Sequence, residues 1–128
     1  MKILGREVLT EAAKQFGTPT YVFDLDAFHD RFQYLKDAVG EDIKVNFCMK
    51  TNPFLTKVSV DDTDRIEVCS YGEFLICKEL GIDPHKLLIS GVLKKEEDMR
   101  EIIDYARVRN ITVVPEIDLP GHSLCIAS

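Results

Sequence analysis

Apolar positions recur along the chain with two different spacings, and each change of spacing marks the start of a new predicted element. The segments GREVLTEAAKQFG and DAFHDRFQYLKDAVG place apolar side chains on one face of a helix, and Gly17 and Gly40 follow the two patterns. Between these helices, TPTYVFDL is rich in aromatic and β-branched residues, which predicts a strand over residues 20–25. Residues 1–42 therefore predict a helix, a strand and a second helix.

From residue 43 onward, short apolar runs alternate with helical segments. The runs IKVNFCM, RIEVCS, KLLISGV and ITVVPEI predict strands over residues 43–49, 65–70, 86–92 and 111–117. The segments YGEFLICKELG and KKEEDMREIIDYARVRN, which lie between these runs, predict helices. Strands that alternate with helices in this way are typical of βα units around a parallel sheet, with right-handed connections.

The connection after the first of these strands is weaker, because FLTKVSVDDTD combines β-branched residues with adjacent aspartates. We expect a short helical turn from about Pro53 and then a loop. The last predicted helix, over residues 94–109, is clearer. Its spacing of i, i+3, i+4 and i+7 places four apolar residues on one stripe that would face the sheet: Met99, Ile102, Ile103 and Ala106.

The fold class that this order predicts is α/β, a partial (β/α)₈ barrel in a single domain of residues 1–128. A closed barrel of this type has eight strands, so four strands amount to about half a barrel or to a small open sheet. Residues 1–42 would precede the βα units of residues 43–128. An open sheet leaves edge strands that a second copy of the chain could cover, which makes a homodimer one expectation.

Composition and charge exclude several classes of protein. Apolar residues make up 45% of the chain and charged residues 30%, which is ordinary for a globular domain. The net charge of −6 comes without a basic stripe, so we expect no nucleic-acid partner. No apolar run approaches the roughly 18 residues of a membrane span, and the N-terminus lacks the pattern of a secretory signal. These features predict a cytoplasmic protein with no membrane partner.

The four cysteines, Cys48, Cys69, Cys77 and Cys125, lie in apolar contexts and form no C-x-x-C pair. We interpret them as reduced and mostly buried thiols, and we expect no metal site.

Polar side chains gather where the predicted strands end. Lys50 follows the first strand, Glu67 lies in the second with Glu73 just beyond it, and Asp118 and His122 follow the fourth. In βα folds, reactive groups lie at the carboxyl ends of the strands. A lysine that is desolvated there has a lowered pKa, and its neutral amine can form a Schiff base with an aldehyde. The alternative is that Lys50 only extends its charge into solvent.

Four segments, FGTPTYVFDLDAF, NFCMKTNP, RIEVCSYGEF and LLISGVLKKEEDM, occur in the order seen in one enzyme family. Over residues 8–99 the chain resembles the fold-type III pyridoxal-phosphate decarboxylases, in particular the diaminopimelate decarboxylase-like branch. The resemblance implies a pyridoxal 5'-phosphate cofactor, and it implies that Lys50 is the lysine that holds it. It also implies that Glu67, where many members have Asp, and Glu73 lie near the cofactor. For Glu73 the alternative is a carboxylate that stabilises a helix N-terminus.

The segment EEDMREIIDYARVRNITVVPEIDLPGHS carries a second resemblance. Over residues 97–125 the chain resembles the family 20 glycoside hydrolases, the β-N-acetylhexosaminidases. Asp118 and His122 match active-site loop positions of that family, which implies a role in binding substrate. The alternative is a tight turn at Pro120-Gly121 with an exposed histidine. Both families are (β/α)₈ barrels, so a chimera joined between Lys94 and Ala106 would be physically feasible, as would a truncated barrel.

These resemblances leave three hypotheses for function. The first is a decarboxylase-like lyase fragment for a basic or dibasic amino acid, incomplete for turnover because the seven glycines form no phosphate-binding loop. The second is an amino-sugar hydrolase fragment that uses Asp118 and His122. The third is a chimeric or designed βα fold without catalytic activity. The first predicts that Lys50 captures pyridoxal phosphate better than a surface lysine such as Lys95.

Overall fold

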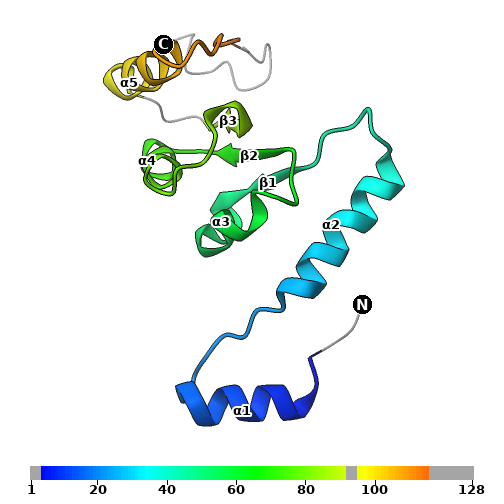
Figure 1. Ribbon diagram of the computed structural model, residues 1–128. Helices are drawn as coiled ribbons and strands as arrows, with labels where there is room; N and C mark the ends of the chain where they lie inside the picture. The colour runs from blue at the N-terminus through cyan, green and yellow to red at the C-terminus, as the bar shows by residue number, and fades with distance from the viewer. Residues whose placement is uncertain (1–3, 92–94, 116–128) are drawn as a thin grey trace, which may run out of the picture.

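Three short parallel strands form an open sheet in the order β1-β2-β3 (Figure 1). The computed structural model describes residues 4–91 and 95–115 of the 128-residue chain. The strands are β1 (Asn46–Cys48), β2 (Arg65–Val68) and β3 (Leu87–Ile89). Phe47 lies opposite Ile66, and Ile66 lies opposite Leu87, so the central strand pairs in parallel with both neighbours. This is the predicted parallel order, and it is compatible with part of a (β/α)₈ barrel.

The helices precede and connect these strands. They are α1 (Arg6–Phe16), α2 (Leu25–Val39), α3 (Thr56–Ser59), α4 (Tyr71–Glu79) and α5 (Glu96–Arg107), with single 3₁₀ turns η1 (Met49–Thr51), η2 (Pro53–Leu55) and η3 (Pro84–Lys86). Gly17 and Gly40 end α1 and α2 as predicted. The weak connection after Pro53 is a turn followed by the four residues of α3, also as predicted.

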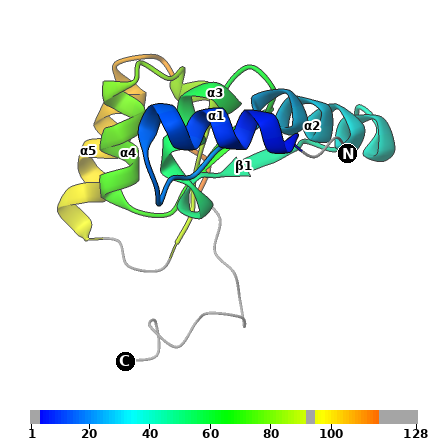
Figure 2. The same ribbon diagram turned by 90° about the horizontal axis from the view of Figure 1, so that it is seen from below.

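One face of the sheet carries the core. Phe47, Ile66 and Val68 are buried there, as expected for alternate positions along paired strands. Helices α4 and α5 pack onto this face and lie side by side in both ribbon views (Figures 1 and 2). Phe74 of α4 and Tyr105 of α5 make an edge-to-face ring contact with centroids 5.3 Å apart. The helices therefore cover one side of the sheet and leave the other side for different side chains.

The strands are shorter than predicted. At two strand ends a side chain accepts the hydrogen bond of a backbone amide, and at a third the backbone turns. Before β1, the Val45 amide donates to Asp64 Oδ2 at 2.8 Å instead of to a neighbouring strand. After β2, the Cys69 amide donates to Glu73 Oε2 at 2.7 Å. After β3, Gly91 has a φ of 92°, which takes the chain out of the extended region. Each of these three features ends the strand's hydrogen-bond ladder short of the range that the apolar pattern predicts.

Residues 20–25 do not form the predicted strand. Residues 20–24 belong to no strand and pair with none among the described residues, Leu25 begins α2, and Tyr21 is fully exposed. Strand propensity alone cannot hold such a segment in a sheet without a neighbour to accept its hydrogen bonds. The chain instead enters α2 directly, because Asp24 caps the helix by accepting a hydrogen bond from the Ala27 amide at 3.0 Å.

The fourth predicted strand is also wrong over residues 111–115, where the structure has no strand; residues 116 and 117 lie outside the described residues. After α5 the Ile111 amide donates to the Ala106 carbonyl at 3.1 Å, and Asn110 has a φ of 56°. The residues that follow this turn pair with no strand in the part of the chain that the structure describes. Val114 is accordingly 82% exposed.

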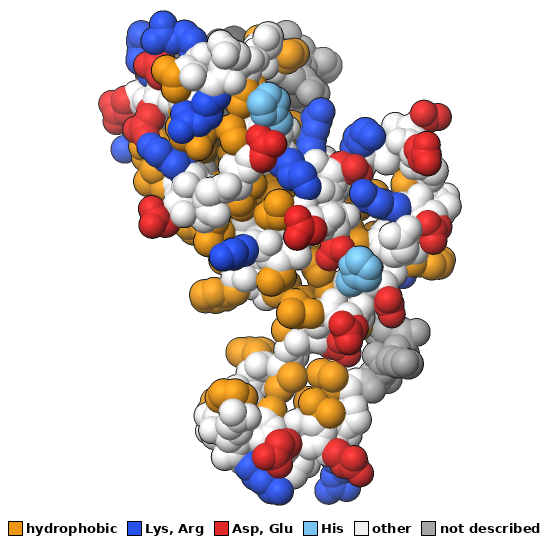
Figure 3. Space-filling model, in the orientation of Figure 1, with side chains coloured by type: hydrophobic (Ala, Val, Ile, Leu, Met, Phe, Trp, Pro, Cys, Tyr) orange, Lys and Arg blue, Asp and Glu red, His pale blue; other side chains and the backbone are white. Residues whose placement is uncertain are grey.

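Helix α1 contributes no buried residue. Large apolar side chains such as Val8 and Phe16 are exposed along it, and hydrophobic side chains gather on the lower part of the surface in Figure 3. Among the helices that the structure describes, none has the length and apolar character needed to cross a bilayer.

The buried stripe of α5 differs by one residue from the predicted stripe. Ile102 and Ala106 are buried as predicted, and Met99 packs against the core. Ile103 is 43% exposed, so its predicted burial is wrong, and Tyr105 contacts the core instead. Compared with the predicted stripe, the buried face of α5 lies slightly further round the helix, toward Tyr105, whose ring packs against Phe74.

The observed buried face of α5 predicts a large loss of stability for one substitution and a small loss for its neighbour. Ile102→Ala is expected to lower the free energy of unfolding by about 2–5 kcal/mol, because it removes a buried side chain. Ile103→Ala removes the same atoms from a largely exposed site and is expected to cost less than about 1 kcal/mol. Urea denaturation of the two variants measures both values. A larger loss for Ile103→Ala would show that the predicted stripe, and not the observed one, faces the sheet.

Candidate functional site

Lys50 is the second residue of η1, the turn that directly follows β1. The chain turns at this point because the Asn52 amide donates to the Met49 carbonyl and the Thr51 hydroxyl donates to the Cys48 carbonyl. Met49 is completely buried beneath the turn, whereas Lys50 is exposed. The predicted position of Lys50 at the carboxyl edge of the sheet is therefore confirmed.

The predicted desolvation of Lys50 is wrong. Its pKa is raised above the usual 10.5, chiefly by the sulfur of Cys48 and further by Cys69 and Glu67. Burial is too slight at this exposed position to outweigh these neighbours. The amine is consequently protonated at neutral pH, and a reaction that requires its neutral form would be slowed.

The sheet face turned away from α4 and α5 brings three reactive groups together. Cys48 lies opposite Glu67 in the register of β1 and β2, and Cys69 follows two residues later on the same face. Their two sulfurs and one carboxylate oxygen lie within 4.8 Å of one another, and all three residues are half-buried. Glu67 was predicted as a site residue from the sequence, and the two cysteines were not. Side chains alternate between the two faces of a strand, so the residues next to buried Phe47 and Ile66 lie on the opposite face. This alternation is the signal that could have identified the cysteines.

Glu67 is held in its ionised form. Its pKa is lowered by a hydrogen bond from the Cys48 thiol, by a second from Ser90 and by the charge of Lys50. The Ser90 hydroxyl donates to Glu67 Oε1 at 2.7 Å. The pKa of Cys48 is raised to about 11 by burial and by its hydrogen bond to Glu67, so at neutral pH this group is a protonated thiol.

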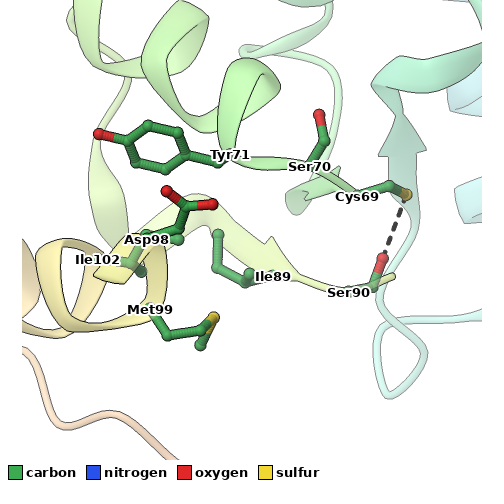
Figure 4. A pocket seen from close by; sticks show the side chains of 8 residues that line it. All are labelled: Cys69, Ser70, Tyr71, Ile89, Ser90, Asp98, Met99 and Ile102. Carbon is green, nitrogen blue, oxygen red and sulfur yellow. Dashed lines mark hydrogen bonds between the residues drawn. The ribbon is translucent and has the colours of Figure 1, made fainter. Parts of the chain in front are cut away.

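Ser90 also contacts the second cysteine. Its Oγ lies 3.3 Å from Cys69 Sγ, as the dashed line in Figure 4 shows. A cavity of about 10 Å³ lies beside this pair, between the ends of β2 and β3 and the side chains of Met99 and Ile102 from α5. This volume holds about one water molecule. It is too small for an organic ligand, and Lys50 does not line it.

Glu73 has a structural role at the start of α4. Its carboxylate accepts the Cys69 amide at 2.7 Å, while its own amide donates to the side chain of the N-cap residue Ser70 at 3.2 Å. These two contacts form a variant of a capping box. Glu73 therefore positions Cys69 through the backbone and corresponds to the alternative interpretation of a carboxylate at a helix N-terminus.

Asp118 and His122 lie outside the described residues, as does Cys125. The site that the structure describes thus consists of Lys50, Glu67 and the two half-buried cysteines, with Ser90 as their hydrogen-bonding partner. An amine next to a carboxylate can capture an aldehyde. Two thiols next to a carboxylate can bind a soft or borderline metal ion.

Comparison with known proteins identifies the family. The catalytic domain of glycosyl hydrolase family 20 matches residues 32–128, and the chain belongs to this family. The match begins well before the segment from Lys94 to Ala106 in which we expected a junction. Helix α5 also runs without interruption through most of that segment.

Individual relatives come from two groups. A diaminopimelate decarboxylase of Aquifex aeolicus (strain VF5) is 31% identical over 101 residues, which are 75% of this chain and 23% of the relative. A beta-hexosaminidase of Vibrio furnissii is 39% identical over 82 residues, 58% of this chain and 13% of the relative. Beta-hexosaminidase 1 of Coccidioides posadasii (strain RMSCC 757 / Silveira) is 69% identical over 26 residues, 20% of this chain and 4% of the relative.

The chain therefore resembles both groups, as the sequence motifs indicated. It spans less than a quarter of the length of these curated relatives.

Proposed function

We propose that Lys50 is the attachment site for pyridoxal phosphate in a decarboxylase-like barrel that acts on a basic or dibasic amino acid. The observation that carries this proposal is the position of an exposed lysine amine at the carboxyl edge of a parallel sheet, under the electrostatic influence of the ionised Glu67. Bound pyridoxal phosphate supplies an electron sink for carbanion chemistry at an amino acid. The similarity to diaminopimelate decarboxylases supports this choice of cofactor.

The described residues fit one end of this cofactor. The Lys50 amine is accessible to an aldehyde, whereas the six glycines that the structure describes are scattered and form no phosphate-binding loop. The carboxylates of Glu67 and Glu73 also disfavour a phosphate beside them. We therefore propose that this chain captures pyridoxal phosphate and catalyses no decarboxylation by itself.

The charges around Lys50 slow its reaction with pyridoxal phosphate but do not shift the equilibrium against it. The pKa of the Lys50 amine is raised chiefly by Cys48, then by Cys69 and by the carboxylate of Glu67, which reduces the fraction of the amine that can attack. The carboxylate of Glu67 would also stabilise a positive charge on this nitrogen with the cofactor bound. The rate of capture should therefore be low at neutral pH, while its equilibrium still favours Lys50.

An absorbance titration with pyridoxal phosphate tests the proposal. The wild-type chain is expected to develop a saturable band near the visible edge, and Lys50→Ala is expected to lose most of it. Because the pKa of Lys50 is raised above 10.5, the initial rate should continue to increase above that pH.

Lys44→Ala is the matched control, since Lys44 is an exposed lysine just before β1, at the opposite edge of the sheet. It is expected to keep the wild-type band. Equal bands in Lys50→Ala and Lys44→Ala would contradict the proposal.

A second candidate function is favoured by the family match over residues 32–128. In this case the chain binds an N-acetylhexosamine through Asp118 and His122. Chemical-shift changes at these two residues on addition of N-acetylglucosamine, with Lys50 unaffected, would favour this candidate. A chain that responds to neither ligand would be a βα fold without catalytic activity.

A further inference from the structure

Two sulfurs and a carboxylate converge on the sheet face that the helices leave uncovered. The donor atoms of Cys48, Glu67 and Cys69 lie within 4.8 Å of one another. They come from β1, from β2 and from the residue directly after β2, so paired backbone holds them in place. All three residues are half-buried, which protects the group from bulk water without closing it off.

We propose that Cys48 Sγ, Glu67 and Cys69 Sγ bind a thiophilic divalent cation of the Zn²⁺ type, with the fourth coordination position open. Thiolates and carboxylates are both ordinary ligands of Zn²⁺, and sulfur selects against Mg²⁺ and Ca²⁺. Three protein ligands and one open position is the arrangement that accepts water or a substrate atom. No metal site was expected from the spacing of the cysteines along the chain, because the register that brings Cys48 and Cys69 together is not visible there.

The donor separation suits a small closure around the ion. With Zn–S bonds of about 2.3 Å, two sulfurs of a tetrahedral site lie about 3.8 Å apart. All three donor atoms already lie within 4.8 Å of one another, so the sulfurs would have to approach by at most about 1 Å. Rotation of the cysteine and glutamate side chains can supply that movement while the paired backbone of the strands stays in place.

Ser90 supplies the outer hydrogen bonds that such a site needs. Its hydroxyl donates to Glu67 Oε1 at 2.7 Å and lies 3.3 Å from Cys69 Sγ, so one side chain orients two of the three ligands. Glu73 holds the backbone of Cys69 in place, because its carboxylate accepts a hydrogen bond from the Cys69 amide. Groups of this kind set ligand orientation, and their loss typically weakens metal binding by about 10–100-fold.

Cobalt binding under reducing conditions tests the proposal, with Co²⁺ as a spectroscopic probe for Zn²⁺. The wild-type chain is expected to bind one Co²⁺ with a sulfur-to-cobalt charge-transfer band in the near ultraviolet, and added Zn²⁺ should displace it. Cys48→Ser and Cys69→Ser should each weaken binding by at least about 10-fold, and Ser90→Ala by about 10–100-fold. Zn²⁺ binding at these three donors requires nothing of Lys50, so the pyridoxal phosphate titration and this one can fail separately.

Two further variants keep the test decisive. Glu67→Gln retains both thiols and should still lose affinity, which decides the question if a cysteine variant fails to fold by circular dichroism. Cys77→Ala is the matched control, because Cys77 is a buried cysteine outside the cluster whose thiol donates to Met49 Sδ. Its binding should equal that of the wild type. Absence of the charge-transfer band, or equal loss in Cys77→Ala, would overturn the proposal.

Discussion

Replacing Phe74 with alanine is expected to lower the free energy of unfolding by about 3–5 kcal/mol. The ring is 1% exposed and lies where α4, α5 and the sheet meet. It stacks with Tyr71 at a centroid distance of 6.1 Å and contacts Tyr105 edge-to-face at 5.3 Å. Loss of the ring leaves a cavity that both helices line, and a small domain cannot close such a cavity without moving a helix.

Urea denaturation followed by circular dichroism measures this loss. Leu75→Ala is the matched control, because Leu75 is the next residue of α4 and is 41% exposed. It is expected to cost less than about 1 kcal/mol. Similar losses for the two variants would mean that α4 does not present Phe74 to the core.

Gly91→Ala is expected to be the most damaging single-methyl change near the site. Gly91 has a φ of 92°, and a Cβ added there would lie 2.3 Å from the Cys69 carbonyl oxygen. The backbone conformation alone costs an L-residue about 1–3 kcal/mol, and the contact with a backbone atom forces the loop after β3 to move. Because Ser90 precedes Gly91, the Ser90 contacts to Glu67 and Cys69 should weaken as well.

Gly72→Ala is the comparison for this variant. A Cβ at Gly72 meets only the Ser70 hydroxyl, at 3.9 Å, and the position lies within α4. Alanine is expected to stabilise the helix there by up to about 1 kcal/mol. Thermal denaturation of both variants should give a lower midpoint for Gly91→Ala and an equal or higher midpoint for Gly72→Ala. An unchanged midpoint for Gly91→Ala would show that the loop does not approach Cys69.

Most of the secondary structure could be predicted from the sequence because local signals agreed with the tertiary contacts. The helices α1, α2 and α4 end near a glycine, and their apolar spacing was clear. The parallel pairing of three strands followed from their alternation with helices. The capping contacts of Asp64 and Glu73 could not be predicted, because they join residues whose side-chain positions depend on the finished fold.

The errors have physical causes of the same kind. The apolar pattern over residues 20–25 and 111–115 indicates strand propensity, but a strand also needs a partner, and sequence spacing does not supply one. Ile103 has the same helical spacing as the buried residues, and only the packing of Tyr105 decides which of them faces the sheet. For Lys50 the sequence gives the strand end but not the charges of Glu67 and the cysteines that surround it.

The candidate site was predicted in part. Lys50 and Glu67 are brought to one edge as expected, and Glu73 caps α4. Cys48 and Cys69 were not predicted as ligands, and Ser90 was expected at a strand end without a partner, because only the register places these side chains on one face. The register therefore brings Cys48 and Cys69 together with Glu67 as a set of ligand atoms, and Ser90 lies beside them.

The most direct test of the central proposal is the distribution of pyridoxal phosphate among the lysines at equilibrium. The chain is equilibrated with a limiting amount of pyridoxal phosphate, reduced with borohydride and digested, and the label on each lysine is measured by mass spectrometry. The proposal predicts that Lys50 carries more label than any other lysine, and clearly more than exposed Lys95 at the start of α5. Label spread evenly over the surface lysines, with Lys50 no richer than Lys95, would contradict it.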